Sequence, residues 1–296
     1  MAADIIDGKK IANQIYDELS EKIDVLKKKN IIPKLSVVLV GDDPASAVYV
    51  RMKGNACQRL GIASETLKFD ADITEQELLS TIEQLNRDAS CHGILVQMPL
   101  PGHINETKII EHILPQKDVD GFHPINKGRL QAGLPCFVPC TPAGVQEILI
   151  RSGYSPEGKH VVVIGRSQIV GMPLAILLAQ KQKGANATVT ICHSRTQNVD
   201  FFTKNADIII AALGRPQAIT ADMLPTHAVV IDVGVNRVED PQSEKGYRLV
   251  GDVDFDGAVK RVKAITPVPG GVGPLTIAML MKNTVLAAEN KLFQTN

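Results

Sequence analysis

Tyr49 and Lys53, in the stretch "YVRMK", have residue types and a spacing that suggest proton chemistry. Side chains four residues apart on a helix lie one above the other on the same face. Burial of a lysine lowers its pKa, so a lysine that turns toward a protein core can act as a base near neutral pH. The alternative is a surface lysine whose stem covers apolar neighbours while its ammonium stays in water.

Three further polar residues stand in apolar or turn-forming stretches. Gln97 interrupts "GILVQMPLP" at the expected carboxyl end of a strand, which is where ligands collect in open α/β sheets. Asp118 and Asp120 lie in "QKDVDGFHP", a loop in which either carboxylate can bind a ligand or simply cap backbone N–H groups. The residues alone leave these roles open.

A second region has the order strand, glycine-containing turn, helix. In "HVVVIGRSQIVGMPLAILLAQ" the turn carries Gly165 and Gly171, as in a unit that aims a helix N-terminus at a pyrophosphate. The glycine spacing is not that of the G-x-G-x-x-G fingerprint, so a turn without a ligand is the alternative.

The next expected strand end favours NADP over NAD. An NAD site usually places an acid there for the ribose 2′-hydroxyl, whereas no Asp or Glu occurs from 172 to 199. His193, Ser194 and Arg195 stand there instead, and Arg166 beside the first glycine adds another donor suited to phosphate. Ordinary exposed loop residues are the competing interpretation.

A third candidate is the loop "TPVPGGVGPLT", from Thr266 to Thr276. Proline fixes φ, while glycine permits positive φ and lets another molecule approach the main chain closely. The apolar stretch that follows predicts a helix from about Leu275, with Pro274 near its first position. The loop is therefore either a ligand-holding segment or a tight turn.

The helix that must carry Tyr49 and Lys53 is expected between two capping residues. Asp43 can cap its start, Pro44 suits the first turn and Gly61 suits the end. We expect its core-facing stripe to consist of Ala45, Val48, Met52, Ala56 and Leu60.

Apolar runs separated by helical patterns predict parallel sheets covered on both faces. The runs are residues 35–40, 93–99, 160–165, 187–192, 207–213 and 228–234. We expect an α/β protein with two α/β domains around a cleft, a boundary near residues 140–158, and a Rossmann-type NADP-binding domain toward the C-terminus.

The composition is that of a globular protein, with 44% hydrophobic and 22% charged residues in 296. Lys plus Arg and Asp plus Glu number 32 each, so no overall field draws the chain to nucleic acid. No apolar run approaches a membrane span, and "MAADIIDGKK" lacks the order of a signal peptide, which favours the cytoplasm. The five cysteines lack metal-ligand spacing, so we expect reduced thiols and no metal.

Taken together, seven motifs carry a resemblance to a known family. In chain order they are "YVRMK", "VQMPLP", "KDVDGFHPIN", "PCTPAG", "GRSQIVGMP", "CHSRT" and "TPVPGGVGP". They resemble motifs of the bifunctional methylenetetrahydrofolate dehydrogenase/methenyltetrahydrofolate cyclohydrolase family, and the resemblance covers almost the whole chain. Two positions depart from the family's usual pattern. Met98 stands where leucine is frequent, a change that conserves side-chain volume. Arg195 stands where lysine is common, which affects only the strength of 2′-phosphate binding.

The resemblance implies roles for individual residues. Tyr49 packs against the folate rings, Lys53 is the acid/base, Gln97 orients that lysine, and Asp120 holds the pterin edge. The cofactor would meet Gly165, Arg166, Ser167, Ser194, Arg195 and Val235. The folate would also contact a loop made of Pro269, Gly270, Gly271, Val272 and Gly273. The implied domains are 1–140 plus 275–296 for folate and catalysis, and 141–274 for NADP.

The implied activity is oxidation of 5,10-methylenetetrahydrofolate with NADP⁺, followed by hydrolysis of the methenyl product, in a cytoplasmic homodimer with no membrane or nucleic-acid partner. Two other functions stay open on the residues alone. One is another two-domain NADP dehydrogenase, although none of the seven histidines stands in a distinctive acid/base motif. The other is a catalytically silent nucleotide-binding or scaffolding protein.

Overall fold

The computed structural model describes residues 2–243, 246–290 and 292–293. It divides the chain into two compact units, each built from two stretches of sequence. The three-stranded unit contains Gln14–Cys140 and Ile277–Asn296. The six-stranded unit contains Met1–Asn13 and Thr141–Thr276.

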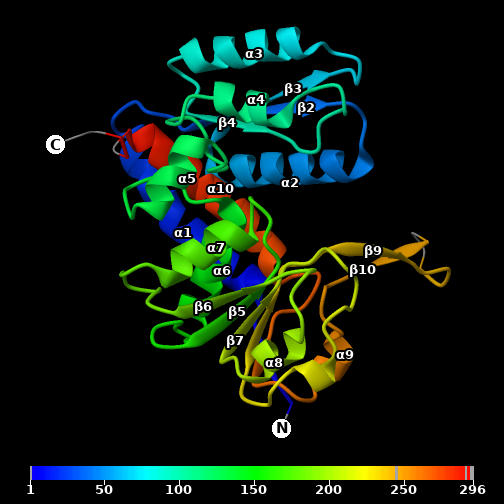
Figure 1. Cartoon of the computed structure of the whole chain (residues 1–296). Coiled ribbons are helices and arrows are strands. Elements are labelled where there is room, and N and C mark those ends of the chain that lie inside the picture. The colour runs from blue at the N-terminus through cyan, green and yellow to red at the C-terminus, as the bar shows by residue number, and fades with distance from the viewer. Residues whose placement is uncertain (1, 244–245, 291, 294–296) are drawn as a thin grey trace. The chain divides into compact units, whose positions relative to one another are not determined.

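The three-stranded unit is an all-parallel sheet between helices (Figure 1). Its strand order is β3-β2-β4, from β2 (Lys34–Val40), β3 (Ala63–Phe69) and β4 (Gly93–Val96). Its helices are α2 (Pro44–Leu60), α3 (Glu75–Arg87), α4 (Glu106–His112) and α5 (Pro124–Gln131). Figure 1 shows α2 on one face of this sheet and α3 with α4 on the other.

Apolar runs and caps explain these elements. β2 is buried at every residue after Lys34, as a strand covered on both faces requires. α3 begins at a capping box in which Thr74 and Glu77 satisfy each other's backbone N–H groups. Its buried face, with Leu78 and Ile82, packs on the sheet through one hydrophobic cluster.

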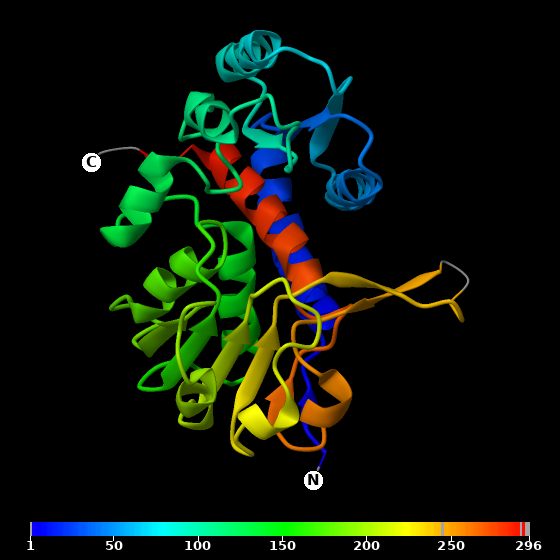
Figure 2. The same ribbon diagram turned by 45° about the vertical axis from the view of Figure 1, so that its right-hand side comes forward.

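The six-stranded unit holds a parallel sheet in the order β1-β11-β8-β7-β5-β6. These strands are β1 (Asp4–Ile5), β5 (His160–Ile164), β6 (Thr188–Cys192), β7 (Ile208–Ala211), β8 (Val229–Asp232) and β11 (Ala264–Ile265). A separate antiparallel hairpin of β9 (Asn236–Glu239) and β10 (Tyr247–Val250) projects from this unit (Figure 2).

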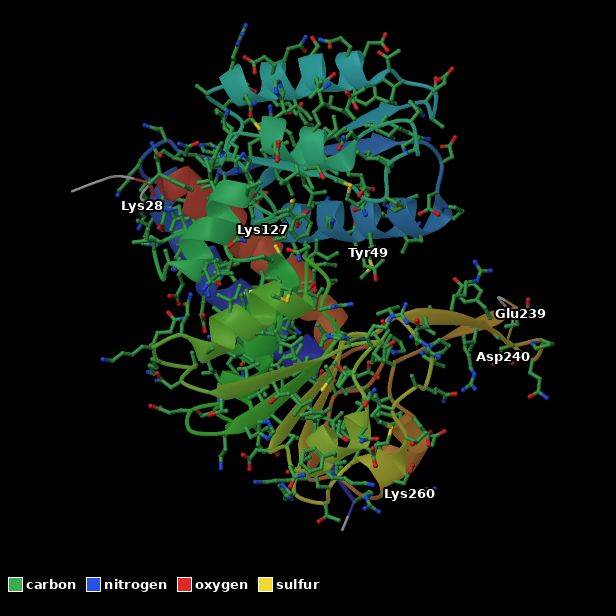
Figure 3. All side chains as sticks on the ribbon, viewed as in Figure 1. Lys28, Tyr49, Lys127, Glu239, Asp240 and Lys260 are labelled. Carbon is green, nitrogen blue, oxygen red and sulfur yellow. The ribbon has the colours of Figure 1, made fainter. Side chains whose placement is uncertain are left out.

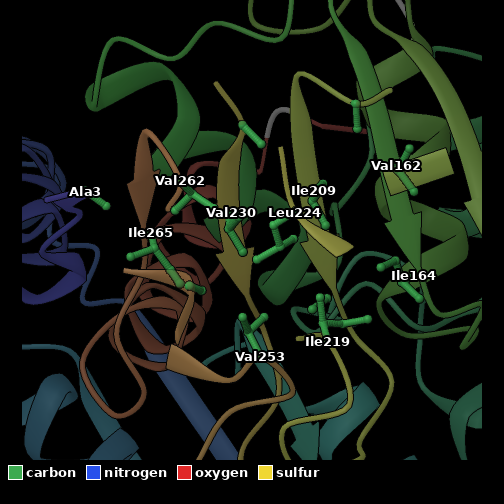
Figure 4. Packing of buried hydrophobic residues seen from close by; sticks show 14 of the residues in the cluster. Ala3, Val162, Ile164, Ile209, Ile219, Leu224, Val230, Val253, Val262 and Ile265 are labelled. Atoms are coloured by element: carbon green, nitrogen blue, oxygen red, sulfur yellow. The ribbon is translucent and has the colours of Figure 1, made fainter. Parts of the chain in front are cut away.

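Helices cover both faces of the six-stranded sheet. Figure 1 shows α6 (Cys140–Arg151) and α7 (Gly171–Ala179) on one side, with α8 (Val199–Lys204) and α9 (Phe255–Ala258) on the other. A short 3₁₀ helix, η1 (Ala221–Met223), lies between β7 and β8 in sequence. Figure 4 shows the buried packing, where Ile209, Val230 and Ile265 of the sheet meet Leu224.

Two long helices contain residues of both units. These are α1 (Gly8–Lys27) and α10 (Val272–Glu289). α10 begins three residues earlier than the expected Leu275, so Pro274 is its third residue rather than its first. Proline in the first turn removes no intrahelical hydrogen bond, which explains why the helix extends past it.

The units differ from the expected domain limits at the N-terminus. Residues 1–13 belong to the six-stranded unit, because Asp4 and Ile5 pair in register with Ala264 and Ile265 of β11. The other unit boundaries fall after Cys140 and after Thr276. Among the residues that the structure describes, no helix is long and apolar enough to span a membrane.

Candidate active site and cofactor-binding loops

Helix α2 places Lys53 on its buried face. Asp43 accepts the backbone N–H of Ser46 at 2.7 Å, Pro44 follows, and Gly61 ends the helix in the left-handed conformation, as expected. Lys53 is only 9% exposed. The buried residues of α2 are Ser46, Val50, Lys53, Ala56, Cys57 and Leu60.

The expected apolar stripe was therefore wrong in its first half. Ala45, Val48 and Met52 are exposed, whereas Ala56 and Leu60 are buried as expected. The physical reason is that Lys53 takes an inward position, which rotates the buried face toward Val50 and away from Met52.

A hydrogen bond to Gln97 orients the Lys53 amine. Lys53 Nζ donates to Gln97 Oε1 at 3.0 Å, and Gln97 Nε2 donates to the Met98 carbonyl at 2.8 Å. The second contact fixes which end of the amide faces the lysine. Gln97 directly follows β4, and its backbone N–H donates to Val38 of β2 at 2.9 Å. The structure thus brings this predicted pair together at a strand end.

Asp120 completes a charged group around Lys53. Burial raises the pKa of the Asp120 carboxyl, while the nearby Lys53 charge lowers it. The Cys140 thiol donates to the Val119 carbonyl at 3.5 Å beside this carboxyl, and burial, reinforced by Asp120, holds the pKa of Cys140 well above its usual range. No sequence pattern marked Cys140 as part of this group, because a lone cysteine is typical of a core. Its place in "PCTPAG" was the available signal.

Asp118 has a different position from Asp120. Its buried carboxylate accepts the backbone N–H groups of Phe122 at 3.1 Å and His123 at 2.8 Å, and the Asn126 amide at 2.8 Å. Burial nevertheless raises the pKa of Asp118 to about 7. Asp118 therefore holds the turn before α5, which resolves the choice that the sequence left open.

Tyr49 lies one helical turn before Lys53 but remains accessible. Its side chain is 38% exposed and projects from α2 on the side away from the three-stranded sheet (Figure 3). Its ring is thus open to a planar ligand, and its stacking role stays a prediction.

In the six-stranded unit, two glycines at the loop after β5 lie so close to other backbone atoms that no side chain fits there. Gly165 has φ 133°, and a Cβ there would lie 2.1 Å from the Ala212 carbonyl oxygen. A Cβ on Gly171 would lie 2.2 Å from the Gly165 carbonyl oxygen. The unusual glycine spacing therefore serves close backbone packing. Ser167 Oγ accepts the N–H of Val170 at 3.1 Å, just before α7, and Arg166 and Ser167 are exposed.

The loop after β6 presents Ser194 and Arg195 to solvent. It is held in a tight turn, in which the Thr196 N–H donates to the His193 carbonyl at 2.8 Å. Since β5 and β6 are paired neighbours, with Ile164 opposite Cys192, Arg166 and Arg195 follow adjacent strand ends. Two exposed guanidinium groups with no nearby acid in sequence suit a phosphate. Val235, after β8, is 47% exposed.

The proline- and glycine-rich loop follows β11 at the same edge of the sheet. Gly271 donates its N–H to the Pro267 carbonyl at 2.9 Å. A Cβ on Gly8 would lie 1.8 Å from the Gly271 carbonyl oxygen, so the start of α1 lies directly against this loop. Gly273 has open space around it. Of the remaining predicted contacts, Pro269 and Gly270 lie in the loop, and Val272 begins α10.

The predicted site residues thus form two groups. Tyr49, Lys53, Gln97 and Asp120 belong to the three-stranded unit. The cofactor residues and the loop of residues 269–273 belong to the six-stranded unit.

Comparison with known proteins identifies the family in both halves of the chain. Residues 6–120 match the model of the tetrahydrofolate dehydrogenase/cyclohydrolase catalytic domain. Residues 139–292 match the NAD(P)-binding domain of the same family.

Full-length relatives agree with this assignment. The bifunctional protein FolD of Chlorobium phaeobacteroides is 54% identical over 95% of this chain and 95% of its own. The solved FolD methylenetetrahydrofolate dehydrogenase/cyclohydrolase of Campylobacter jejuni is 48% identical, with a TM-score of 0.92 over 98% of this chain and 99% of its own. A Trypanosoma brucei enzyme, solved with NADP cofactor and an inhibitor, is 40% identical, with a TM-score of 0.93 over 99% of this chain and 100% of its own. The chain belongs to the tetrahydrofolate dehydrogenase/cyclohydrolase family.

Proposed function

We propose that this chain carries out two consecutive reactions of one-carbon metabolism. It oxidises 5,10-methylenetetrahydrofolate to 5,10-methenyltetrahydrofolate with NADP⁺, and it hydrolyses the methenyl product to 10-formyltetrahydrofolate. The observation that carries this proposal is the buried Lys53, hydrogen-bonded to Gln97 at 3.0 Å beside Asp120, in the region that matches the family's catalytic domain. The FolD relatives with matching length support both activities.

The oxidation depends mainly on geometry. The carbon that loses hydride lies between two nitrogens, whose lone pairs stabilise the resulting cation, so no strong base is needed in this step. NADP⁺, when bound, supplies the hydride acceptor. In this chain Tyr49 has the exposed ring that would stack on the folate and fix its orientation.

The hydrolysis requires proton handling. Water that attacks the methenyl cation must lose a proton, and opening of the ring requires that a nitrogen gain one. Lys53 is the proton-handling group, Gln97 orients its amine, and the Asp120 carboxyl lies beside it. Asp120 is also the residue proposed to hold the pterin edge.

The cofactor loops fit NADP better than NAD. Arg166, Ser194 and Arg195 are exposed after adjacent strands, and the end of β6 carries no acid for a free ribose hydroxyl. Gly165, Ser167 and Val235 complete the proposed cofactor contacts. The Trypanosoma brucei relative with bound NADP supports this choice.

We assign folate binding and the acid/base residues to the three-stranded unit and NADP binding to the six-stranded unit. The loop residues Pro269 to Gly273 are proposed as further folate contacts. A cytoplasmic homodimer without membrane or nucleic-acid partners remains part of this proposal. The family resemblance supports the homodimer, and the balanced charge, the lack of long apolar runs and the N-terminal sequence support the rest.

One assay separates this function from the alternatives. Purified protein receives 5,10-methylenetetrahydrofolate with NADP⁺, and in parallel 5,10-methenyltetrahydrofolate alone. We expect reduced cofactor in the first reaction and loss of the methenyl compound in the second. A dehydrogenase for another substrate would do neither while still binding NADP⁺, and a silent nucleotide-binding protein would turn over no substrate of either kind.

A further inference from the structure

A buried carboxylate in the six-stranded unit binds only neutral donors. Asp252, two residues after β10, is 0% exposed. Its Oδ2 accepts the backbone N–H groups of Leu213 and Gly214, the second at 2.9 Å. Its Oδ1 accepts the backbone N–H of Arg215 and the side-chain amide of Asn236, each at 2.9 Å. Because both oxygens face two donors each, the site demands a side chain that only accepts hydrogen bonds.

The loop that Asp252 holds lies at the point where the strand order reverses. From β5 the chain runs outward to β6, then returns to β7 on the other side of β5 and continues to β8. In open parallel sheets, ligands bind at the carboxyl ends of the two strands that flank such a reversal. Here those ends are Gly165 after β5 and Ala212 after β7, and they touch: a Cβ on Gly165 would lie 2.1 Å from the Ala212 carbonyl oxygen.

A second carboxylate fixes Asp252 itself. Asp232, the last residue of β8, accepts the backbone N–H of Asp252 at 3.0 Å and of Val253 at 2.9 Å. The fit leaves no room for side chains: a Cβ on Gly234 would lie 2.3 Å from Asp252 Cγ, and one on Gly251 would lie 1.8 Å from Asp232 Oδ2. The ends of β7 and β8 and the base of the hairpin are thus joined through two carboxylates.

We propose that Asp252 is a positioning residue for the nicotinamide end of NADP⁺, and that it acts by holding residues 213–215 at the crevice between β5 and β7. This inference rests on the proposed function. The 2′-phosphate end of the cofactor is assigned to Arg195 after β6, on the other side of β5. The two ends of the cofactor therefore depend on different loops, and Asp252 holds the loop of the nicotinamide end.

The test compares two ligands on the full-length protein by titration calorimetry. NADP⁺ reaches both loops, whereas 2′,5′-ADP, which lacks the nicotinamide half, reaches only the phosphate end. In Asp252→Asn one carboxylate oxygen becomes an NH₂ group, which is a donor. In either orientation of the amide this NH₂ faces an N–H of residues 213–215, so two donors oppose each other and the loop must shift. We expect NADP⁺ affinity to fall about tenfold or more, while 2′,5′-ADP affinity stays within about twofold.

Two further variants control this result. Asp254→Asn removes the same charge two residues away, where Asp254 caps the short α9 and Asn caps equally well, so both affinities should match the parent. Asn236→Ala removes one donor to Asp252 without creating a clash, and should give a smaller loss that is again selective for NADP⁺.

The outcomes separate this inference from the proposed function. Unchanged NADP⁺ affinity in Asp252→Asn, or an equal loss for both ligands, overturns the positioning role. If Asp252→Asn does not fold, Asn236→Ala decides, and parental NADP⁺ affinity in that variant overturns the inference. A parent protein that binds no NADP⁺ overturns the proposed function, and this inference with it.

Discussion

At the scale of single residues, the contact between Lys53 and Gln97 tolerates a change of protonation. Gln97 Oε1 is a neutral acceptor whose orientation is fixed by the bond from Nε2 to the Met98 carbonyl. Both an ammonium and a neutral amine have an N–H to donate, so this contact can be kept in either state. The amine would therefore keep one orientation through the proton transfers that we propose for it in hydrolysis.

Asp118 should make stability depend on pH. Burial raises the pKa of this carboxyl from 3.8 to about 7, so the folded chain binds its proton more tightly than the unfolded chain. The stabilisation is fully present below about pH 4 and is lost as the pH rises through about 7. Asp118→Asn does not titrate, so the free energy of unfolding of the parent should fall relative to this variant over that window, by at most about 4 kcal/mol.

Urea unfolding of both proteins at about pH 5 and about pH 8 measures this effect. His123 titrates in both proteins, so its own contribution cancels in the difference, whereas Asp120 and Lys127 interact with the Asp118 charge and contribute to the measured difference. A difference between the two proteins that does not change with pH would show that Asp118 is ionised throughout.

The pairing of Gln97 with Lys53 was predicted from the family resemblance, and the structure brings the two side chains together. The residues alone placed Gln97 only at a strand end where ligands collect. The carboxylates of Asp118 and Asp120 could not be told apart, because which one faces Lys53 depends on the fold of their loop. The buried stripe of α2 was misjudged because a charged residue at an inward position breaks the apolar pattern that marks a buried face.

At the scale of elements, the loop between β5 and α7 depends on backbone contacts that only glycine allows. Gly171→Ala places a methyl group 2.2 Å from the Gly165 carbonyl oxygen, so the loop or the helix start must move. We expect NADP⁺ affinity to fall and the free energy of unfolding to drop by about 1–3 kcal/mol.

Gly128→Ala is the matched control, since Gly128 lies within α5 and a Cβ added there would meet no other atom within 4 Å. Alanine there should leave stability unchanged or raise it by up to about 1 kcal/mol. Thermal unfolding and NADP⁺ titration check both variants. Equal behaviour of the two alanines would contradict the close-packed loop.

The loops after β5 and β6 should set cofactor preference. Arg166→Ala or Arg195→Ala should weaken NADP⁺ binding about tenfold or more, because each removes a charged donor to the 2′-phosphate, and should change NAD⁺ binding much less. Lys181→Ala removes an exposed positive charge from the same unit and should change neither. Equal losses for NADP⁺ and NAD⁺ in the arginine variants would sink the assignment. Neighbouring cations need not contribute additively.

Whether the sequence predicted a strand depended on how apolar that strand is. All six continuous Val- and Ile-rich runs contain strands of the two parallel sheets, each within three residues of the expected limits. β3 was missed because its residues "ASETLKF" are mostly polar and none is fully buried. The β9–β10 hairpin was missed for the same reason: most of its residues are exposed or only partly buried.

At the scale of the whole molecule, the alternation of apolar strands and helices in the sequence predicted the fold class, an α/β protein with parallel sheets. The place of residues 1–13 was not predictable, because β1 has only two residues and its partner β11 also has two, near the other end of the chain. Two-residue strands are too short to show the alternation of apolar and polar residues that marks a strand in a sequence.

We propose that this chain separates oxidation from hydrolysis because only hydrolysis depends on proton handling by Lys53. The most direct measurement supplies Lys53→Met with 5,10-methylenetetrahydrofolate and NADP⁺, and follows reduced cofactor and the methenyl intermediate together. Methionine keeps much of the length and apolar stem but removes the amine. We expect hydrolysis to fall about 10² to 10⁴-fold, oxidation to fall far less, and methenyltetrahydrofolate to accumulate. Hydrolysis of added methenyltetrahydrofolate at the parental rate would show that Lys53 is not the proton-handling group.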